Sequence, residues 1–489
     1  MTGRAVANRW SAPAVPRPDA GFSVVLVTAT ILVLLILGLA LVSLVSENSG
    51  LSVHHVQSSQ AFYAAQAGLE YGVKKLSSNP SWSGLASPGK RVGNATFTVA
   101  PPDSVDENGA PLPPGQKRIV ATGVSGEATR VLQIRLAVGG TTTIAGTGAT
   151  GHTGDGGVAT AATFKNAEGV AMGPDGSIYV ADTDNHVIRK IAAGTGIITT
   201  VAGSGSPGWS GDGLSATSAR LQFPQDLAVA ANGDLYIADT GNHSIRKVTV
   251  ATGVITTIAG SGSPGSSGDL GPPTAAKLSS PRGIALAANG DYYIADRGNN
   301  KIRKVTALTG LITTYAGTGT TGYTGDGGLA TAARLRSPEG VELAANGDVY
   351  IADTANHAIR RVTALTGVIT TVAGTGTAGY TGDGGAATSA RLNGPESVTI
   401  TATGDLYVAD SGNNVVRRFI VAGTIATVAG TGVAGFSGDG GPGTSAQFND
   451  PSGVGVDTSG VLYIVDTSNQ RVRKISGALS VVGWVETRV

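Results

Sequence analysis

The last two thirds of the chain repeat one segment of about 57 residues six times, and this periodicity constrains the fold more than any other feature. The motif LYIADTGNHSIRKV at 235–248 recurs in fixed phase with a Gly-Asp pair. Its tyrosine stands at evenly spaced positions, which are Tyr179, Tyr236, Tyr293, Tyr350, Tyr407 and Tyr463. Six copies in phase predict six copies of one structural unit.

Each copy contains four candidate strands, which in the second copy are 226–230, 234–239, 244–250 and 254–260. Short turns with Asn-Gly, Gly-Asn or Thr-Gly join them, and such turns favour hairpins because they accept positive φ. Three successive hairpins make a four-stranded antiparallel sheet. The predicted fold class is therefore mainly β, a six-bladed β-propeller.

The ring of sheets must be closed, since an unpaired joint would leave open strand edges. An orphan fourth strand, TTTIAG at 141–146, precedes the first complete copy in the right phase. We expect it to complete the sixth sheet beside the strand RVRKIS at 471–476. The C-terminal segment SVVGWVETRV at 480–489 is the competing candidate for that position.

The motif Y-I-A-D-x-x-N-H-x-I-R-K resembles the NHL repeat over residues 141–476, and the SGDGG linkers resemble those of a bacterial subgroup of NHL proteins. The resemblance implies a six-bladed propeller. The third letter of the Asn-His-Leu triplet varies in this chain, where Val, Ser, Ala and Lys take its place.

Most of the motif is predicted to be scaffold. Asp239 ends a strand and can accept turn N–H groups, and Asn242 suits a left-handed turn position. Arg246 is expected to pair with Asp239 of its own or a neighbouring sheet. The residues assigned this structural role are Tyr179, Asp182, Arg189, Tyr236, Asp239, Arg246, Asp296, Arg303, Asp353, Arg360, Asp410, Arg417, Asp466 and Arg473.

Two sets of loops are predicted to share one rim, the turns after the second strand of each sheet and the linkers between sheets. The candidate binding residues of this rim are Asn185, His186, Asn242, His243, Asn356 and His357, with the Gly-Asp residues Asp155, Asp212, Asp269, Asp326, Asp383 and Asp439. A protein or carbohydrate is the expected ligand, and the alternative is that each aspartate only stabilises its own loop. Ca²⁺ is a candidate, although one carboxylate per loop falls short of the six to eight oxygens it prefers.

No catalytic residue and no metal site are predicted. A lyase branch of similar propellers uses a His-ligated zinc on the axis, but here the innermost strands contain no histidine, and their acidic residues Asp226 and Glu342 recur in no other copy. The repeat looks too uniform for an inserted active site, although a propeller lyase or lactonase stays the alternative. The net charge of +1 gives no nucleic-acid footprint, and the absence of cysteine excludes thiolate chemistry.

The segment 22–45 is apolar and contains no charged residue. As a helix it is roughly 36 Å long, enough to span a bilayer, and longer than the 7–15 apolar residues of a secretory signal. Arg4, Arg9 and Arg17 precede it, so everything after the segment is predicted to lie outside the cytoplasm. The apolar residues of 51–76 keep to one face, which predicts that the helix continues.

Residues 17 to about 80, and AFYAAQAGLE at 61–70 above all, resemble type IV pilin-like proteins of the minor pilin and pseudopilin kind. The resemblance implies a basic leader, residues 1–21, cleaved between Gly21 and Phe22, and other pilin-like subunits as partners. Leu26 stands where most pilins have a glutamate, which puts ordinary incorporation into a filament in doubt.

The chain thus divides into a leader at 1–21, a transmembrane and amphipathic helix at 22–80, a small β region at 81–139 and the propeller at 140–489. We expect an anchored protein of a bacterial cell envelope or pilus whose propeller binds a protein or carbohydrate. A structural spacer in a pilus-like assembly is a further alternative.

Overall fold

The computed structural model describes residues 53–78, 84–101, 116–126, 128–137, 140–476 and 480–488, which form two compact units. The leader 1–21 and the apolar segment 22–45 lie outside the described residues. Within the described ranges, no helix is long and apolar enough to cross a membrane.

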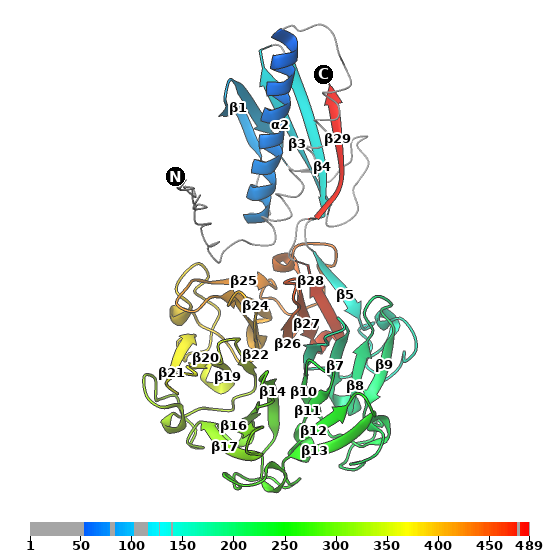
Figure 1. Ribbon diagram of the computed structural model, residues 1–489, viewed down its shortest axis with the longest axis vertical. Helices are drawn as coiled ribbons and strands as arrows, with labels where there is room; N and C mark the ends of the chain where they lie inside the picture. Colours follow the sequence, from blue (N-terminus) through cyan, green and yellow to red (C-terminus); the bar gives the residue numbers. More distant parts are fainter. Residues whose placement is uncertain are drawn as a thin grey trace, which may run out of the picture. The chain divides into compact units, whose positions relative to one another are not determined.

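In the part of the first unit that the structure describes, one helix packs on a five-stranded sheet (Figure 1). Its elements are α2 (Val53–Ser78), β1 (Leu85–Val92), β2 (Ala95–Val99), β3 (Gln116–Ser125), β4 (Ala128–Ala137) and β29 (Ser480–Arg488), and the strand order is β1-β2-β3-β4-β29. Small residues let the helix approach the sheet closely: Ala61 and Ala65 are buried against β3, where a Cβ on Gly123 would collide with the helix backbone.

The position of β29 corrects the predicted domain boundaries. The segment was expected in the propeller domain 140–489, as a rival closing strand, but it is the neighbour of β4 in the first unit. The physical reason lies in strand pairing: β5 already closes the sixth blade, whereas β4 has an edge to which β29 pairs. The small β region predicted at 81–139 therefore takes its fifth strand from the end of the chain.

The second unit is a six-bladed propeller, as predicted (Figure 1). Five blades follow the chain: β6 (Val170–Met172), β7 (Ile178–Asp182), β8 (Val187–Ile191) and β9 (Ile198–Ala202); β10 (Pro224–Val229), β11 (Leu235–Asp239), β12 (Ser244–Thr249) and β13 (Val254–Ala259); β14 (Pro281–Leu286), β15 (Tyr292–Asp296), β16 (Lys301–Thr306) and β17 (Leu311–Ala316); β18 (Val341–Leu343), β19 (Val349–Asp353), β20 (Ala358–Val362) and β21 (Ile369–Ala373); β22 (Pro395–Ile400), β23 (Leu406–Asp410), β24 (Val415–Phe419) and β25 (Ile425–Ala429).

The sixth blade joins the two ends of the repeat, because β26 (Pro451–Val456), β27 (Leu462–Asp466) and β28 (Arg471–Ile475) are completed by β5 (Thr141–Ala145). β5 runs antiparallel to β28, with Ala145 opposite Val472 and Thr141 opposite Ile475. The closing strand predicted from its phase is thereby confirmed.

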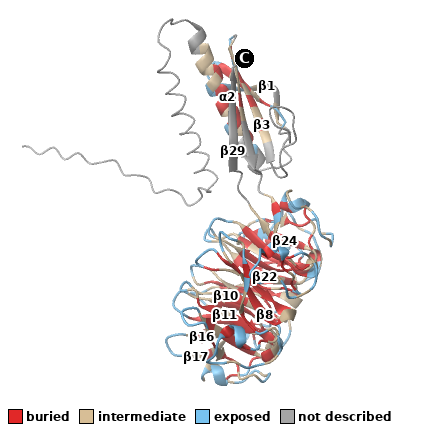
Figure 2. Cartoon of the chain, turned by 90° about the vertical axis from the view of Figure 1, so that its right-hand side faces the viewer, coloured by how far each residue is buried: buried red, intermediate tan, exposed pale blue. Residues whose placement is uncertain are grey.

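The turn between the second and third strands of every blade is one turn of 3-10 helix, from Thr183–Asn185 in the first blade to Thr467–Asn469 in the sixth. A second short 3-10 turn lies in each linker, as at Ala159–Ala161. The apolar core lies between neighbouring sheets, where alternate Val, Ile and Ala side chains of two blades meet. The buried residues accordingly follow the strands of the blades (Figure 2).

Candidate functional site

A buried arginine organises each blade. In the second blade the side chain of Arg246 has no exposed surface, and its Nη1 lies 3.2 Å from Oδ2 of Asp239 and its Nη2 2.7 Å from Oδ1 of Asp212. Asp239 also accepts hydrogen bonds from the backbone N–H of Gln222 at 2.7 Å and from Nδ2 of Asn242 at 2.8 Å. Burial raises the pKa of Asp239 to about 6, although Asn242 and Arg246 favour its charged form. The expected pairing of Arg246 within its own blade is present.

The same arrangement recurs in every blade. The six arginines pair with the aspartate that ends the second strand at 3.2–3.4 Å: Arg189 with Asp182, Arg246 with Asp239, Arg303 with Asp296, Arg360 with Asp353, Arg417 with Asp410, and Arg473 with Asp466.

The Gly-Asp residues predicted for a binding rim lie on the other side of these arginines. All six, Asp155, Asp212, Asp269, Asp326, Asp383 and Asp439, form ion pairs with the buried guanidinium groups. Several also accept a hydrogen bond from the outermost strand, as Asp269 does from Oγ1 of Thr314 at 2.7 Å. They hold the linker to the blade, while between 38% and 48% of each carboxylate side chain stays exposed.

The histidines predicted for the rim link neighbouring blades. Nδ1 of His243 accepts a hydrogen bond from the backbone N–H of Ser280 in the following linker at 3.0 Å, and its backbone is left-handed with φ 52°. His186 and His357 make the same bond to Phe223 and Gly394. In the other blades Asn300, Asn414 and Gln470 provide an oxygen acceptor at this position. Because Nδ1 accepts, each imidazole must be neutral there, and burial lowers the pKa of all three histidines.

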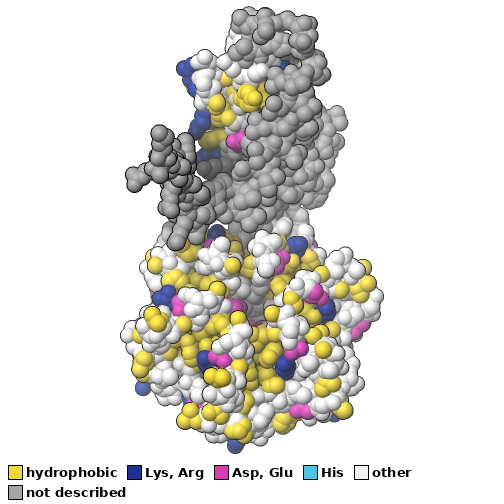
Figure 3. Space-filling view, viewed as in Figure 1, with side chains coloured by type: hydrophobic (Ala, Val, Ile, Leu, Met, Phe, Trp, Pro, Cys, Tyr) yellow, Lys and Arg dark blue, Asp and Glu magenta, His cyan; other side chains and the backbone are white. Residues whose placement is uncertain are grey.

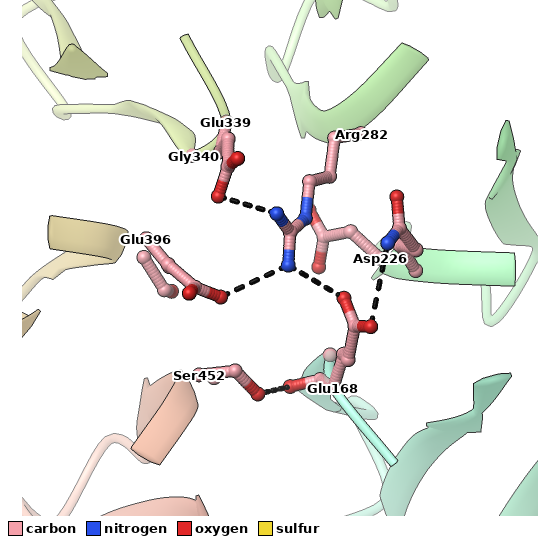
Figure 4. A pocket seen from close by; sticks show the side chains of 11 residues that line it. Glu168, Asp226, Arg282, Glu339, Gly340, Glu396 and Ser452 are labelled. Atoms are coloured by element: carbon pink, nitrogen blue, oxygen red, sulfur yellow. Dashed lines mark hydrogen bonds and ion pairs between the residues drawn. The ribbon is translucent and has the colours of Figure 1, made fainter. Parts of the chain in front are cut away.

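Sequence reasoning missed a cluster on the propeller axis. One position at or just before the start of each innermost strand holds a polar residue that differs between copies. The six residues are Glu168, Gln225, Arg282, Glu339, Glu396 and Ser452. They keep the spacing of the repeat, and they line one pocket (Figure 4). The signal was a position of the repeat at which the charge of the side chain changes from copy to copy.

Arg282 lies at the centre of this axial cluster. Its Nη2 is 2.7 Å from Oε2 of Glu168 and 2.9 Å from Oε2 of Glu396, and its Nη1 is 2.6 Å from Oε2 of Glu339 (Figure 4). Gln225 donates to Glu168 at 3.3 Å, and the hydroxyl of Ser452 donates to the backbone carbonyl of the same residue. All six blades therefore meet in one hydrogen-bonded network.

The axial cluster holds more acid than base. Burial raises the pKa of Glu396 to about 8 and raises that of Glu168, although Arg282 opposes both shifts. A second cation, Arg297, binds the other oxygen of Glu339 at 2.8 Å. The guanidinium of Arg282 lies between the three glutamates, and within the described ranges no group of three or more His, Asp or Glu side chains is arranged to hold a metal ion.

A cavity of about 310 Å³ runs from the axial cluster along the six innermost strands. Its lining includes Asp226 and Glu342, the two acidic residues that occur once each in the repeat. Burial raises the pKa of both carboxyl groups to about 7.

The outer surface of the propeller carries a band of mostly aromatic side chains, each three positions before a Gly-Asp aspartate. In phase, the residues are His152, Trp209, Ser266, Tyr323, Tyr380 and Phe436. All are exposed, with 47% of Trp209 and 42% of Tyr380 accessible. On the face of the propeller seen in Figure 3, charged groups occur mostly in pairs of opposite sign. Several of the aromatic side chains lie against the arginine of such a pair, as Tyr323 does against Arg360 and Tyr380 against Arg417.

Comparison with known proteins identifies the repeat. The model of the NHL repeat matches residues 164–191, 221–248, 278–305, 335–361, 392–419 and 448–475. The chain is 32% identical over 268 residues to the chloroplast protein Suppressor of Quenching 1 of Arabidopsis thaliana, covering 52% of this chain and 25% of that protein. It is 30% identical over 290 residues to NHL repeat-containing protein 2 of Bos taurus, covering 53% of this chain and 40% of that protein.

The solved structures agree on the fold. An auxiliary nutrient binding protein from Bacteroides ovatus superposes with a TM-score of 0.51 at 17% sequence identity, covering 81% of this chain and 99% of that one. This chain spans less than half the length of the two curated relatives, and a likeness to a solved structure at 17% identity shows the fold alone. The chain carries six NHL repeats, one in each blade of a β-propeller.

Proposed function

We propose that this protein is a binding protein of the bacterial cell envelope. Its propeller engages a protein or carbohydrate partner through the aromatic band, which consists of the side chains of His152, Trp209, Tyr323, Tyr380 and Phe436. The observation that carries the proposal is the exposure of these rings at one repeated position of the linkers. Exposed aromatic side chains that recur in one band are typical of recognition surfaces.

The rings are held in place before any partner arrives. The hydroxyl of Tyr380 is 2.9 Å from Oγ1 of Thr427 on the outermost strand, and Nε1 of Trp209 donates to Oγ1 of Thr257 at 3.3 Å. The guanidinium carbon of Arg417 lies 5.2 Å from the centre of the Tyr380 ring. A fixed ring loses little conformational entropy on binding, which favours affinity.

The rival interpretation is that the rings only shield the buried arginines. It is tested by replacing four rings together, Trp209→Ala, Tyr323→Ala, Tyr380→Ala and Phe436→Ala, and measuring binding of the full chain to glycan arrays and to arrays of surface proteins. We expect the wild-type signal to be lost while the thermal unfolding transition persists.

A matched control is the pair Leu308→Ala and Leu365→Ala. These leucines are 94% and 93% exposed and lie in turns between the third and fourth strands, outside the repeated position that the aromatic side chains occupy. The control should keep the wild-type signal. Equal binding by the four-ring variant and the wild type would reject the proposal.

The anchor is proposed from residues 22–45, with the pilin-like processing that the resemblance implies. Mass spectrometry of the mature protein tests it. A chain beginning at Phe22 supports a pilus-type system, whereas intact residues 1–21 leave an uncleaved signal anchor. Recovery of the full chain from the soluble fraction would reject the anchor.

A further inference from the structure

The axial cavity has a chemical character that the rest of the repeat does not predict. Its walls are the innermost strands β6, β10, β14, β18, β22 and β26, and each of these is the edge strand of its sheet. One side of every strand therefore presents unpaired backbone groups to the cavity. The volume of about 310 Å³ is at the lower end of the range for small-molecule sites.

The two carboxyl groups in this cavity break the repeat at positions that otherwise hold small residues. At the position of Asp226 the other blades have Gly169, Gly283, Gly340, Ser397 and Gly453. At the position of Glu342 they have Ala171, Ala228, Ala285, Thr399 and Gly455. Two carboxyl groups thus face a space that the small residues leave open, from blades that are separated by one blade between them.

Among the described residues, no cationic side chain forms an ion pair with Glu342. Its Oε1 accepts the backbone N–H of the adjacent Leu343 at 3.0 Å, and no other hydrogen bond or ion pair to it is found among the described residues. The side chain is surrounded by protein, and the surface that stays accessible faces the cavity. A carboxyl group in this state is expensive to ionise without a cation beside it.

Asp226 is in a related position. Its Oδ2 accepts the backbone N–H of Ile284 at 3.0 Å. The positive charge that acts on Asp226 is that of Arg282, whose guanidinium already pairs with three glutamates at 2.6–2.9 Å. The cavity therefore holds two carboxyl groups whose own cation is missing.

The geometry points to an organic cation as the missing partner. Within the described ranges, no three carboxylate or imidazole groups are arranged around one metal position. An ammonium group differs from a metal ion because it needs acceptors in only a few directions, with three N–H donors. One carboxylate and the free carbonyl groups of an edge strand can satisfy all three.

We propose that the axial cavity binds a linear diamine, with one ammonium group at Glu342 and the other at Asp226. The ligand enters from the end of the cavity opposite the axial cluster, because Arg282 and its three glutamates occupy the other end. The proposal is independent of the aromatic band, which lies on the outer surface of the linkers.

Isothermal titration calorimetry of the full chain at pH 8 tests the proposal with three probes: 1,4-diaminobutane, 1-aminobutane and CaCl₂. We expect saturable 1:1 binding of the diamine, with 1-aminobutane about tenfold or more weaker, equivalent to about 1.4 kcal/mol for the second ammonium group. The variants Glu342→Gln and Asp226→Asn keep the shape of the side chains, and each should weaken the diamine by a similar factor.

The variant Glu70→Gln, in the first unit, is the matched control and should bind the diamine as the wild type does. Thermal unfolding of every variant establishes that it is folded. Absence of saturable diamine binding, equal binding by the two cavity variants and the wild type, or tighter binding of Ca²⁺ than of the diamine would each overturn the proposal. The four-ring variant should still bind the diamine, so failure here is distinct from failure of the proposed recognition surface.

Discussion

Oε1 of Gln470 in the last blade accepts a hydrogen bond from the backbone N–H of Asn166 at the start of the first blade, at 2.7 Å. Nε2 of the same side chain donates to Oδ1 of Asn166 at 3.1 Å. This pair is the sixth interblade link, and the other five are made by His186, His243, Asn300, His357 and Asn414. The propeller is thus closed twice, once by the strand pair β5 and β28 and once by a side chain.

The interblade links predict a loss of stability in acid. Folded histidines with lowered pKa stay neutral while the unfolded chain takes up protons near its ordinary pKa of about 6.5, so the free energy of unfolding should fall as the pH drops below that value. Replacing all three by asparagine, the residue already used at Asn300 and Asn414, should keep the links and remove this dependence. Urea unfolding at pH 7.5 and pH 5.0 measures it.

The variant with alanine at all three histidine positions is the comparison. Its free energy of unfolding should be lower than that of the asparagine variant by about 1 kcal/mol per lost link at both pH values. An asparagine variant that loses as much stability in acid as the wild type would contradict the assignment.

The axial cluster predicts a strong dependence on Arg282. Its replacement by methionine leaves three glutamates facing one another, and breaking a buried ion pair in this way costs about 3–5 kcal/mol. The loss should be largest at pH 8 and smaller at pH 5, where Glu168 and Glu396, whose pKa values are raised, are protonated to a greater extent. Chemical denaturation at the two pH values measures the difference.

Rescue tests the same relationship. Adding Glu168→Gln, Glu339→Gln and Glu396→Gln to the methionine variant removes the repulsion and should restore much of the lost stability at pH 8. A methionine variant as stable as the wild type at both pH values would show that the ion pairs contribute nothing.

The cavity carboxyl groups predict the opposite pH trend from the histidines. The pKa of Asp226 and of Glu342 is raised to about 7, so the folded state keeps their protons after the unfolded state has released them. Their contribution to stability is full at acid pH and is lost as the pH rises from about 4 to about 7. The double variant Asp226→Asn with Glu342→Gln should flatten this decline, measured by thermal unfolding across that range in the background in which His186, His243 and His357 are replaced by asparagine.

The shared sheet predicts that the C-terminal strand stabilises the first unit. Removing residues 480–489 exposes the edge of β4, which β29 covers. Differential scanning calorimetry should show the transition of the first unit at lower temperature, while the propeller transition is unchanged because β5 and β28 still close the ring. A shift of the propeller transition instead would contradict the prediction that β29 stabilises the first unit.

The propeller could be predicted from the sequence because periodicity reports a structure that repeats. The phase of TTTIAG identified β5 as the closing strand, and the structural role predicted for Asp239 and Arg246 is confirmed. The left-handed position predicted for Asn242 is wrong by one residue: His243 adopts it, while Asn242 ends the 3-10 turn and its side chain bonds Asp239. The partner of β29 could not be predicted in the same way, since an alternating strand does not specify which edge it joins.

The axial cluster was missed for a related reason. Glu168, Arg282 and Glu396 are far apart in the sequence, and each looks like an ordinary substitution in its own copy. They meet only when the ring closes. Aligning the six copies and searching for a position that varies in charge inside a regular strand would have found the cluster, whereas the expectation of a uniform repeat concealed it.

The insertion of the propeller between β4 and β29 has a consequence for the order of synthesis. The ribosome completes β4 long before it reaches β29, and at about 5–20 residues per second the ~340 residues between them take roughly 17–70 s to make. During that time the edge of β4 has no partner. The closing of β28 onto β5 then brings residue 476 beside residue 140, where the chain can return to β4. The first unit to be translated is therefore the last to be finished.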